Sequence, residues 1–121
     1  MSTNQAPIKL NIANQPMTDR ELLESAAKAA GYEFDSCEPF EIAHEHKGGT
    51  NWNEWNPLVD DGDALRLAVK LGLNIETPRH KGFGSTCGNQ TVFRDDAYEQ
   101  TRRAIVRAAA AIGETYNHSV P

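Results

Sequence analysis

Long apolar runs and cysteines are scarce in this sequence of 121 residues. A membrane-spanning helix needs about 20 consecutive apolar residues, and the longest apolar stretches here are interrupted by charges. Residues 1–15 also lack the apolar core of a signal peptide. We therefore expect a cytoplasmic protein with no membrane partner, in which Cys37 and Cys87 are reduced. The sequence alone does not decide whether these two cysteines form a bridge.

Basic residues are in the minority, with 12 Lys and Arg against 17 Asp and Glu and a net charge of -5. A general DNA or RNA binder needs a positive field, so nucleic acid is not the expected partner. The hydrophobic share of 39% is sufficient for one core in a chain of this length. We expect a flexible polar lead-in over 1–16, a single domain over 17–116 and a frayed tail over 117–121.

Helix start and stop signals are the clearest patterns in the chain. Thr18 and Glu21 have the spacing of a capping box, and Gly31 is placed to end the helix that follows, over about 19–30. A second helix begins after Asp60 or Asp61, either of which is a good N-cap, and is expected to stop at Gly72.

A third helix begins after Asp95 or Asp96 and is expected to end at Gly113 or soon after it. Strand patterns are shorter and lie in 32–46 (two pieces separated by Pro39), 73–75 and 91–93. Between the last two, residues 77–90 form a basic, glycine-rich segment that we interpret as a loop. The predicted fold is therefore α+β, with three helices packed on a small antiparallel sheet.

Both tryptophans lie just before the second helix, at Trp52 and Trp55. Tryptophan is generally well buried, so the favoured interpretation places both rings over the core. The alternative is an aromatic platform on which a planar ligand stacks, with Asn56 beside it. In that case Arg79 and Lys81 of the glycine-rich loop would hold a phosphate.

The third helix carries further candidate ligands in Arg102, Arg103 and Arg107. Arg103 and Arg107 are four residues apart and share one helix face. They suit a phosphate or the acidic patch of a partner. The alternative is that these arginines only solvate the outer face of a helix whose other face is core.

Signals for catalysis and metal binding are weak. Cys87 lies in a glycine-rich stretch near His80, but a nucleophile needs a base that orients it, and the sequence does not establish one. His44 and His46 would share one face of a strand, which can begin a zinc site. No recognised zinc-ligand spacing is present, so we predict no metal, no cofactor and no catalytic residue.

Three blocks of the sequence carry a family resemblance. They are the helix-start block Met17–Gly31, the Trp-Asn-Pro-Leu entry and second helix over 55–71, and the Thr-Arg-Arg-Ala-Ile-Val-Arg block over 101–110. Together they resemble a family of small accessory proteins encoded by tailed bacteriophages and prophages of Gram-negative bacteria. The resemblance implies a phage origin rather than a particular chemistry. It does not extend to 32–50 or 74–95.

Small phage accessory proteins commonly act on their host, so the resemblance implies a non-enzymatic protein that binds a host factor in the bacterial cytoplasm, as an anti-defence inhibitor would. The first alternative is a protein that binds or sequesters a small nucleotide-type ligand. The second is a small enzyme that uses Cys87 or a metal site. A homo-oligomer is compatible with the alanine-rich third helix, and the sequence does not decide it.

Overall fold

The computed structural model describes residues 17–43, 52–80 and 82–118. Within them the helices are α2 (Asp19–Ala30), α3 (Asp61–Leu71) and α4 (Ala97–His118). The strands are β1 (Glu33–Asp35), β2 (Glu41–Ala43), β3 (Trp52–Glu54), β4 (Ile75–Glu76), β5 (Ser85–Cys87) and β6 (Gln90–Val92). This confirms the predicted α+β class with antiparallel strand pairing.

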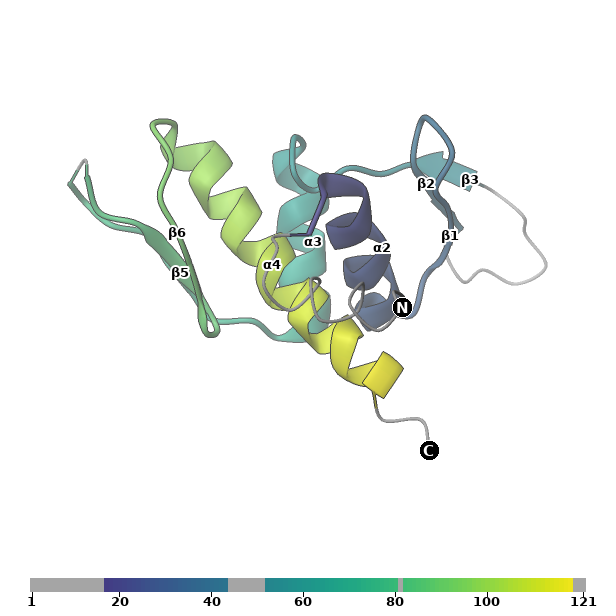
Figure 1. Cartoon of the computed structure of the whole chain (residues 1–121). Coiled ribbons are helices and arrows are strands. Elements are labelled where there is room, and N and C mark those ends of the chain that lie inside the picture. Colours follow the sequence, from purple (N-terminus) through teal and green to yellow (C-terminus); the bar gives the residue numbers. More distant parts are fainter. Residues whose placement is uncertain (1–16, 44–51, 81, 119–121) are drawn as a thin grey trace, which may run out of the picture.

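The strands form two sheets rather than the single sheet that we expected. Each has three strands, in the orders β1-β2-β3 and β4-β5-β6. The three helices lie between the two sheets, which occupy opposite ends of the molecule (Figure 1). Side chains that belong to different sheets are therefore separated by the helical layer.

The predicted ends of α2 and α3 are confirmed, because local hydrogen bonds determine them. Thr18 Oγ1 accepts from the backbone N–H of Glu21, whose carboxylate accepts from the Thr18 N–H at 2.9 Å. Asp60 is the N-cap of α3 and accepts from the backbone of Asp63 at 2.8 Å. Both helices end at a glycine in the left-handed conformation, which is strained for other residues.

Gly113, the first of the two predicted ends of α4, is not the end of this helix. Asp96 caps its start as expected, but the helix passes through Gly113 and continues to His118. Gly113 lies where α4 crosses α2, and a Cβ atom at this position would overlap the carbonyl of Ser25. The glycine therefore permits close approach of two helices and does not act as a stop signal.

Two strands were not predicted. All three residues of β3 are exposed, so its sequence has no alternating buried and exposed pattern to detect. β5 lies inside the glycine-rich segment that we interpreted as a loop. It pairs with β6 through a two-residue turn, Gly88 and Asn89, in which Gly88 has a φ of 59°. A positive φ at the first turn residue matches a tight hairpin turn, and glycine accommodates it without strain.

The core lies where α2, α3 and α4 meet, and the most extensive contact joins α2 to α4. Alanines supply much of the interface, among them Ala26, Ala27, Ala104 and Ala109, all fully buried. Small side chains let the helix axes approach closely. None of the described helices has an apolar stretch of the length that crossing a membrane requires. His44, His46, Lys81 and the predicted lead-in 1–16 lie outside the described residues.

Candidate functional site

The two tryptophans have different environments. Trp55 is 5% exposed, and its ring meets Tyr32 edge-on at 5.8 Å and Phe40 at 5.9 Å between ring centroids. Trp52 is 43% exposed on the edge strand β3. The core interpretation therefore describes Trp55 alone, and the two rings do not form one platform.

The Trp-Asn-Pro-Leu entry to α3 has a structural role in this fold. The Asn56 side chain accepts from the backbone of Leu58 at 3.0 Å, while the Asp63 carboxylate accepts from the backbone of Asn56 at 2.9 Å. Arg102 fastens this turn to α4 by donating to the Leu58 carbonyl and to Asp61. Asn56 and Arg102, two of the candidate ligand-binding residues, are thus occupied by contacts within the protein.

The remaining candidate arginines are carried by other parts of the chain than the tryptophans. Arg103 and Arg107 are on α4, and Arg103 donates to Asp19 of α2 at 3.0 Å. Arg79 is exposed in the segment between β4 and β5, whereas Trp52 is in β3. Figure 1 shows β5 and β3 at opposite ends of the molecule. A nucleotide site that combines Trp52 with Arg79 is not assembled by this fold.

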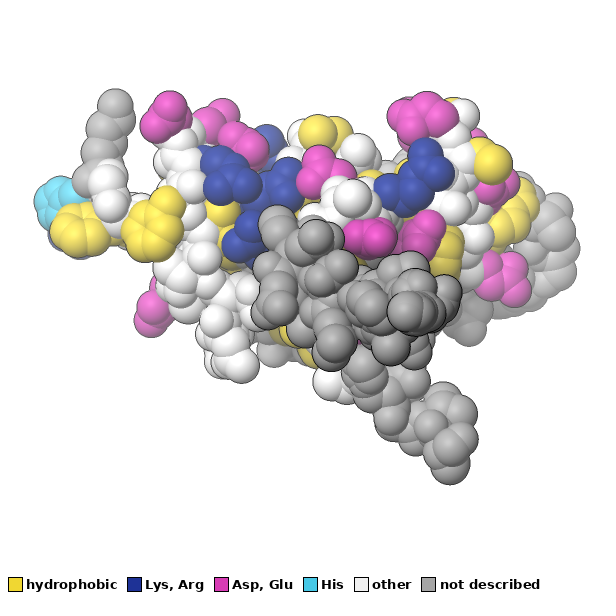
Figure 2. All heavy atoms as spheres, in the orientation of Figure 1, with side chains coloured by type: hydrophobic (Ala, Val, Ile, Leu, Met, Phe, Trp, Pro, Cys, Tyr) yellow, Lys and Arg dark blue, Asp and Glu magenta, His cyan; other side chains and the backbone are white. Residues whose placement is uncertain are grey.

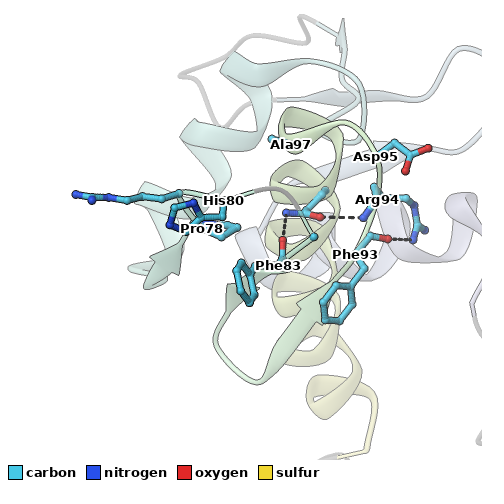
Figure 3. Close-up of a pocket in the computed structure, with 10 residues that line it drawn as sticks. Pro78, His80, Phe83, Phe93, Arg94, Asp95 and Ala97 are labelled. Carbon is cyan, nitrogen blue, oxygen red and sulfur yellow. Dashed lines mark hydrogen bonds between the residues drawn. The ribbon is translucent and has the colours of Figure 1, made fainter.

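The structure reveals a different feature where β5, β6 and α4 meet. A surface hollow of about 590 Å³ is lined at one side by Pro78 and His80 and at the other by Phe93 and Arg94. The rings of Phe83 and Phe93 project side by side from the ends of the two strands (Figure 3). They are 60% and 61% exposed, although phenylalanine is usually buried in proteins.

This hollow continues into a second one along α3 and α4. The second hollow has a volume of about 490 Å³, shares Pro78 and Ala97 with the first, and is bordered by Leu65 and Tyr98. Tyr98 is 70% exposed on the first turn of α4. We call the joined region the aromatic surface and define it by Pro78, His80, Phe83, Phe93, Tyr98 and Leu65.

Gln100 fixes the backbone that carries these rings. Its side chain is buried, and its amide nitrogen donates to Ser85 Oγ at 3.0 Å. The same nitrogen donates to the Phe83 carbonyl at 3.1 Å, and the amide oxygen accepts from the backbone of Arg94 at 2.8 Å (Figure 3). One amide thus ties both sides of the hairpin to α4. The aromatic surface is held in place before any partner binds.

Sequence reasoning missed the aromatic surface. Phe93 was assigned to a strand, and Phe83 and Tyr98 were given no role. The available signal was weak: Phe83 lies between two glycines in a polar segment, and Tyr98 lies among charged residues at a helix start. Neither pattern tells an exposed ring from a buried one.

The cysteines do not form a catalytic pair or a disulfide. Both are free thiols, Cys87 buried in β5 and Cys37 exposed after β1. Burial raises the pKa of the Cys87 thiol, and hydrogen bonding to Asp35 raises the pKa of the Cys37 thiol. Since the thiolate is the nucleophile, both shifts reduce reactivity at neutral pH. Over the described ranges, no group of three or more His, Cys, Asp or Glu side chains is arranged to hold a metal ion.

No protein-family model, curated protein or solved structure matches this chain. The likeness of its helical blocks to phage proteins therefore remains a prediction from the sequence.

Proposed function

We propose that this chain is a non-enzymatic binding protein that docks on a partner protein through the aromatic surface. The supporting observation is the exposure of Phe83, Phe93 and Tyr98 around two joined hollows. Exposed apolar patches on small proteins commonly mark interaction sites, and aromatic rings are enriched at the centres of protein interfaces. Because Gln100 holds the backbone, binding would require little additional ordering.

The charges at the edge of the aromatic surface indicate the kind of partner. Arg79 forms no hydrogen bond or ion pair with any residue that the structure describes, and the nearest carboxylate to Arg94 is that of Glu99, at 3.6 Å. These guanidinium groups lie at the rim of an apolar patch in a protein of net charge -5, and the rim also includes one carboxylate, that of Asp95. The complementary partner is a protein with an apolar patch bordered by carboxylates.

The phage resemblance supplies the biological setting of this proposal. It supports a partner among the proteins of a Gram-negative host, and inhibition of a defence protein is the role that we propose. A nucleotide-sequestering protein is less well supported, because Trp55 lies in the core and Trp52 belongs to β3, at the opposite end of the molecule from β5, which follows the Arg79 segment. An enzyme that uses Cys87 is also less well supported, because this thiol is buried.

The test uses the double variant Phe83→Ser, Tyr98→Ser. The tagged wild-type chain would be used to isolate a partner from a Gram-negative lysate, and the partner would then be purified and titrated with both proteins. We expect the dissociation constant to rise at least about tenfold in the double variant, since central aromatic residues carry most interface energy. The fold should be retained because the substituted rings are exposed.

The matched control is Trp52→Ser, which removes an exposed aromatic ring at the other end of the molecule. It should bind the partner as the wild type does. Equal affinity of the double variant and the wild type for the purified partner would refute the proposed docking surface. A wild-type chain that retains no host protein above background would refute the proposed class of partner.

A further inference from the structure

A group of three arginines lies on α4 or just before it. Arg94 is also at the rim of the aromatic surface, whereas Arg103 and Arg107 are not part of that surface. Arg103 and Arg107 lie one turn apart on α4, and Arg94 is separated from the start of this helix by Asp95 and Asp96. Burial and then the charges of Arg103 and Arg94 lower the pKa of the Arg107 guanidinium, so the three charges act on one another. Figure 2 shows Lys and Arg side chains gathered over the first half of α4.

The carboxylates around this arginine cluster (Arg94, Arg103 and Arg107) do not neutralise it. Asp19 pairs with Arg103, but Glu99 is 3.6 Å from Arg94. Arg107 forms no ion pair or hydrogen bond within the part of the chain that the structure describes. Two carboxylates thus pair with three positive charges, and the charge of Arg107 is left without a partner among the described residues. Positive charges that lie near one another repel, and a bound anion relieves this repulsion.

A buried donor in the same cluster is also unused. The Nε atom of Arg103 is inaccessible to solvent and has no hydrogen-bond partner among the described residues. The Arg103 side chain is only 14% exposed, and its Nη1 is held by Asp19. Buried N–H groups are normally paired, and an orphaned one costs stability until an acceptor reaches it.

We propose that the arginine cluster binds the phosphate group of a small anionic molecule. Guanidinium groups donate paired N–H bonds that match the oxygen atoms of phosphate. A hollow of about 350 Å³ beside Arg107 has room for an apolar part of the ligand. Its lining includes Met17, Leu22 and Ala110, and also Glu114, whose carboxylate accepts a hydrogen bond from Ser25 at 2.7 Å. The net charge of -5 repels a long polyanion such as nucleic acid, whereas a small anion needs only the local field.

The test is thermal unfolding in sodium phosphate, sodium acetate and sodium chloride at matched ionic strength. Phosphate should raise the midpoint of unfolding of the wild type in a saturable way, because a ligand that binds only the folded state stabilises it. In Arg107→Gln, the concentration of phosphate at half-saturation should rise at least about tenfold, since a charge-assisted hydrogen bond is lost. Arg107→Lys keeps the charge but lacks the paired N–H geometry. Its phosphate concentration at half-saturation should lie between those of the wild type and Arg107→Gln.

The matched control is Arg66→Gln, which removes an exposed arginine from α3 and should leave the response to phosphate unchanged. The phosphate group could belong to a phosphate ester or to free phosphate. Repeating the titration with a nucleoside monophosphate distinguishes these two sources. Tighter binding of that compound indicates an ester, and equal binding indicates free phosphate. An acetate response as large as the phosphate response, or an equal phosphate response in Arg107→Gln, would overturn the proposal. The aromatic-surface variants are not involved, so the two proposals fail independently.

Discussion

Trp55 and Trp52 show how neighbouring residues of one type acquire different roles. Trp55 touches the rings of Tyr32 and Phe40 and is 5% exposed, whereas Trp52 lies on an edge strand with its ring partly in solvent. Replacing a buried aromatic ring with alanine leaves a cavity that the surrounding side chains cannot fill. The stability of the domain therefore depends on only one of the two tryptophans.

We predict that Trp55→Ala lowers the free energy of unfolding by about 3–5 kcal/mol, as large-to-small core substitutions do. Trp52→Ala should change it by no more than about 0.5–1 kcal/mol, because little apolar area is lost from the core. Urea titration followed by circular dichroism measures both. A Trp52→Ala protein as unstable as Trp55→Ala would show that the exposed ring is held by contacts of similar strength.

At the scale of the element, Gly113 and Gly62 are glycines that occupy helices for different reasons. A Cβ atom at 113 would overlap the backbone of Ser25, which cannot move without shifting α2. A Cβ atom at 62 would meet only the Arg66 guanidinium and the Asp60 carboxylate, the nearest atom lying at 3.1 Å. The guanidinium ends a flexible side chain and is free to move aside.

We predict opposite effects of alanine at these two positions. Gly113→Ala should destabilise the protein by about 1–3 kcal/mol or more, since overpacking at the α2–α4 contact outweighs the gain in helix propensity. Gly62→Ala should be neutral or stabilising by up to about 1 kcal/mol. Thermal unfolding of the two variants tests this. An unaffected Gly113→Ala protein would mean that the helices are not in close contact at this crossing.

The three helices show how far the sequence predicts the fold. The caps at Thr18, Asp60 and Asp96 were predictable because each acts on N–H groups two or three residues away. The continuation of α4 through Gly113 was not predictable, because it depends on the contact with Ser25, which is distant in the sequence. Strands β3 and β5 were missed for a related reason: their pairing partners, rather than their own residues, make them strands.

The candidate sites show the same difference between features that nearby residues determine and features that distant contacts determine. Arg102, Arg103 and Arg107 could be placed on α4 from the sequence, but only the structure distinguishes Arg102, which is tied to Leu58 and Asp61, from Arg107, which has no described partner. The aromatic surface could not be predicted from the sequence, because the exposure of Phe83 and Tyr98 depends on which faces the rest of the molecule leaves uncovered.

For the whole molecule, the two sheets differ in how firmly the helices hold them. In the edge strand β6, Val92 is buried against the core, and its neighbour β5 is fastened to α4 by Ser85, which bonds Thr101 at 2.7 Å. In the edge strand β3 all three residues are exposed, and the strand pairs with β2 alone. The two edge strands are similar in length, so their difference in burial should appear as a difference in local stability.

We predict that the hydrogen-bonded amides of β3 exchange with solvent at least about tenfold faster than those of β6, a difference of about 1.4 kcal/mol in the free energy of local opening. Native-state hydrogen exchange by NMR measures both in one experiment. A firm β5–β6 hairpin keeps Phe83 and Phe93 in the geometry that a partner meets, so less ordering free energy is lost on binding. Equal exchange rates in β3 and β6 would contradict the predicted difference in local stability. Rigidity would then be no reason to place the binding surface on the β4–β6 sheet rather than around Trp52.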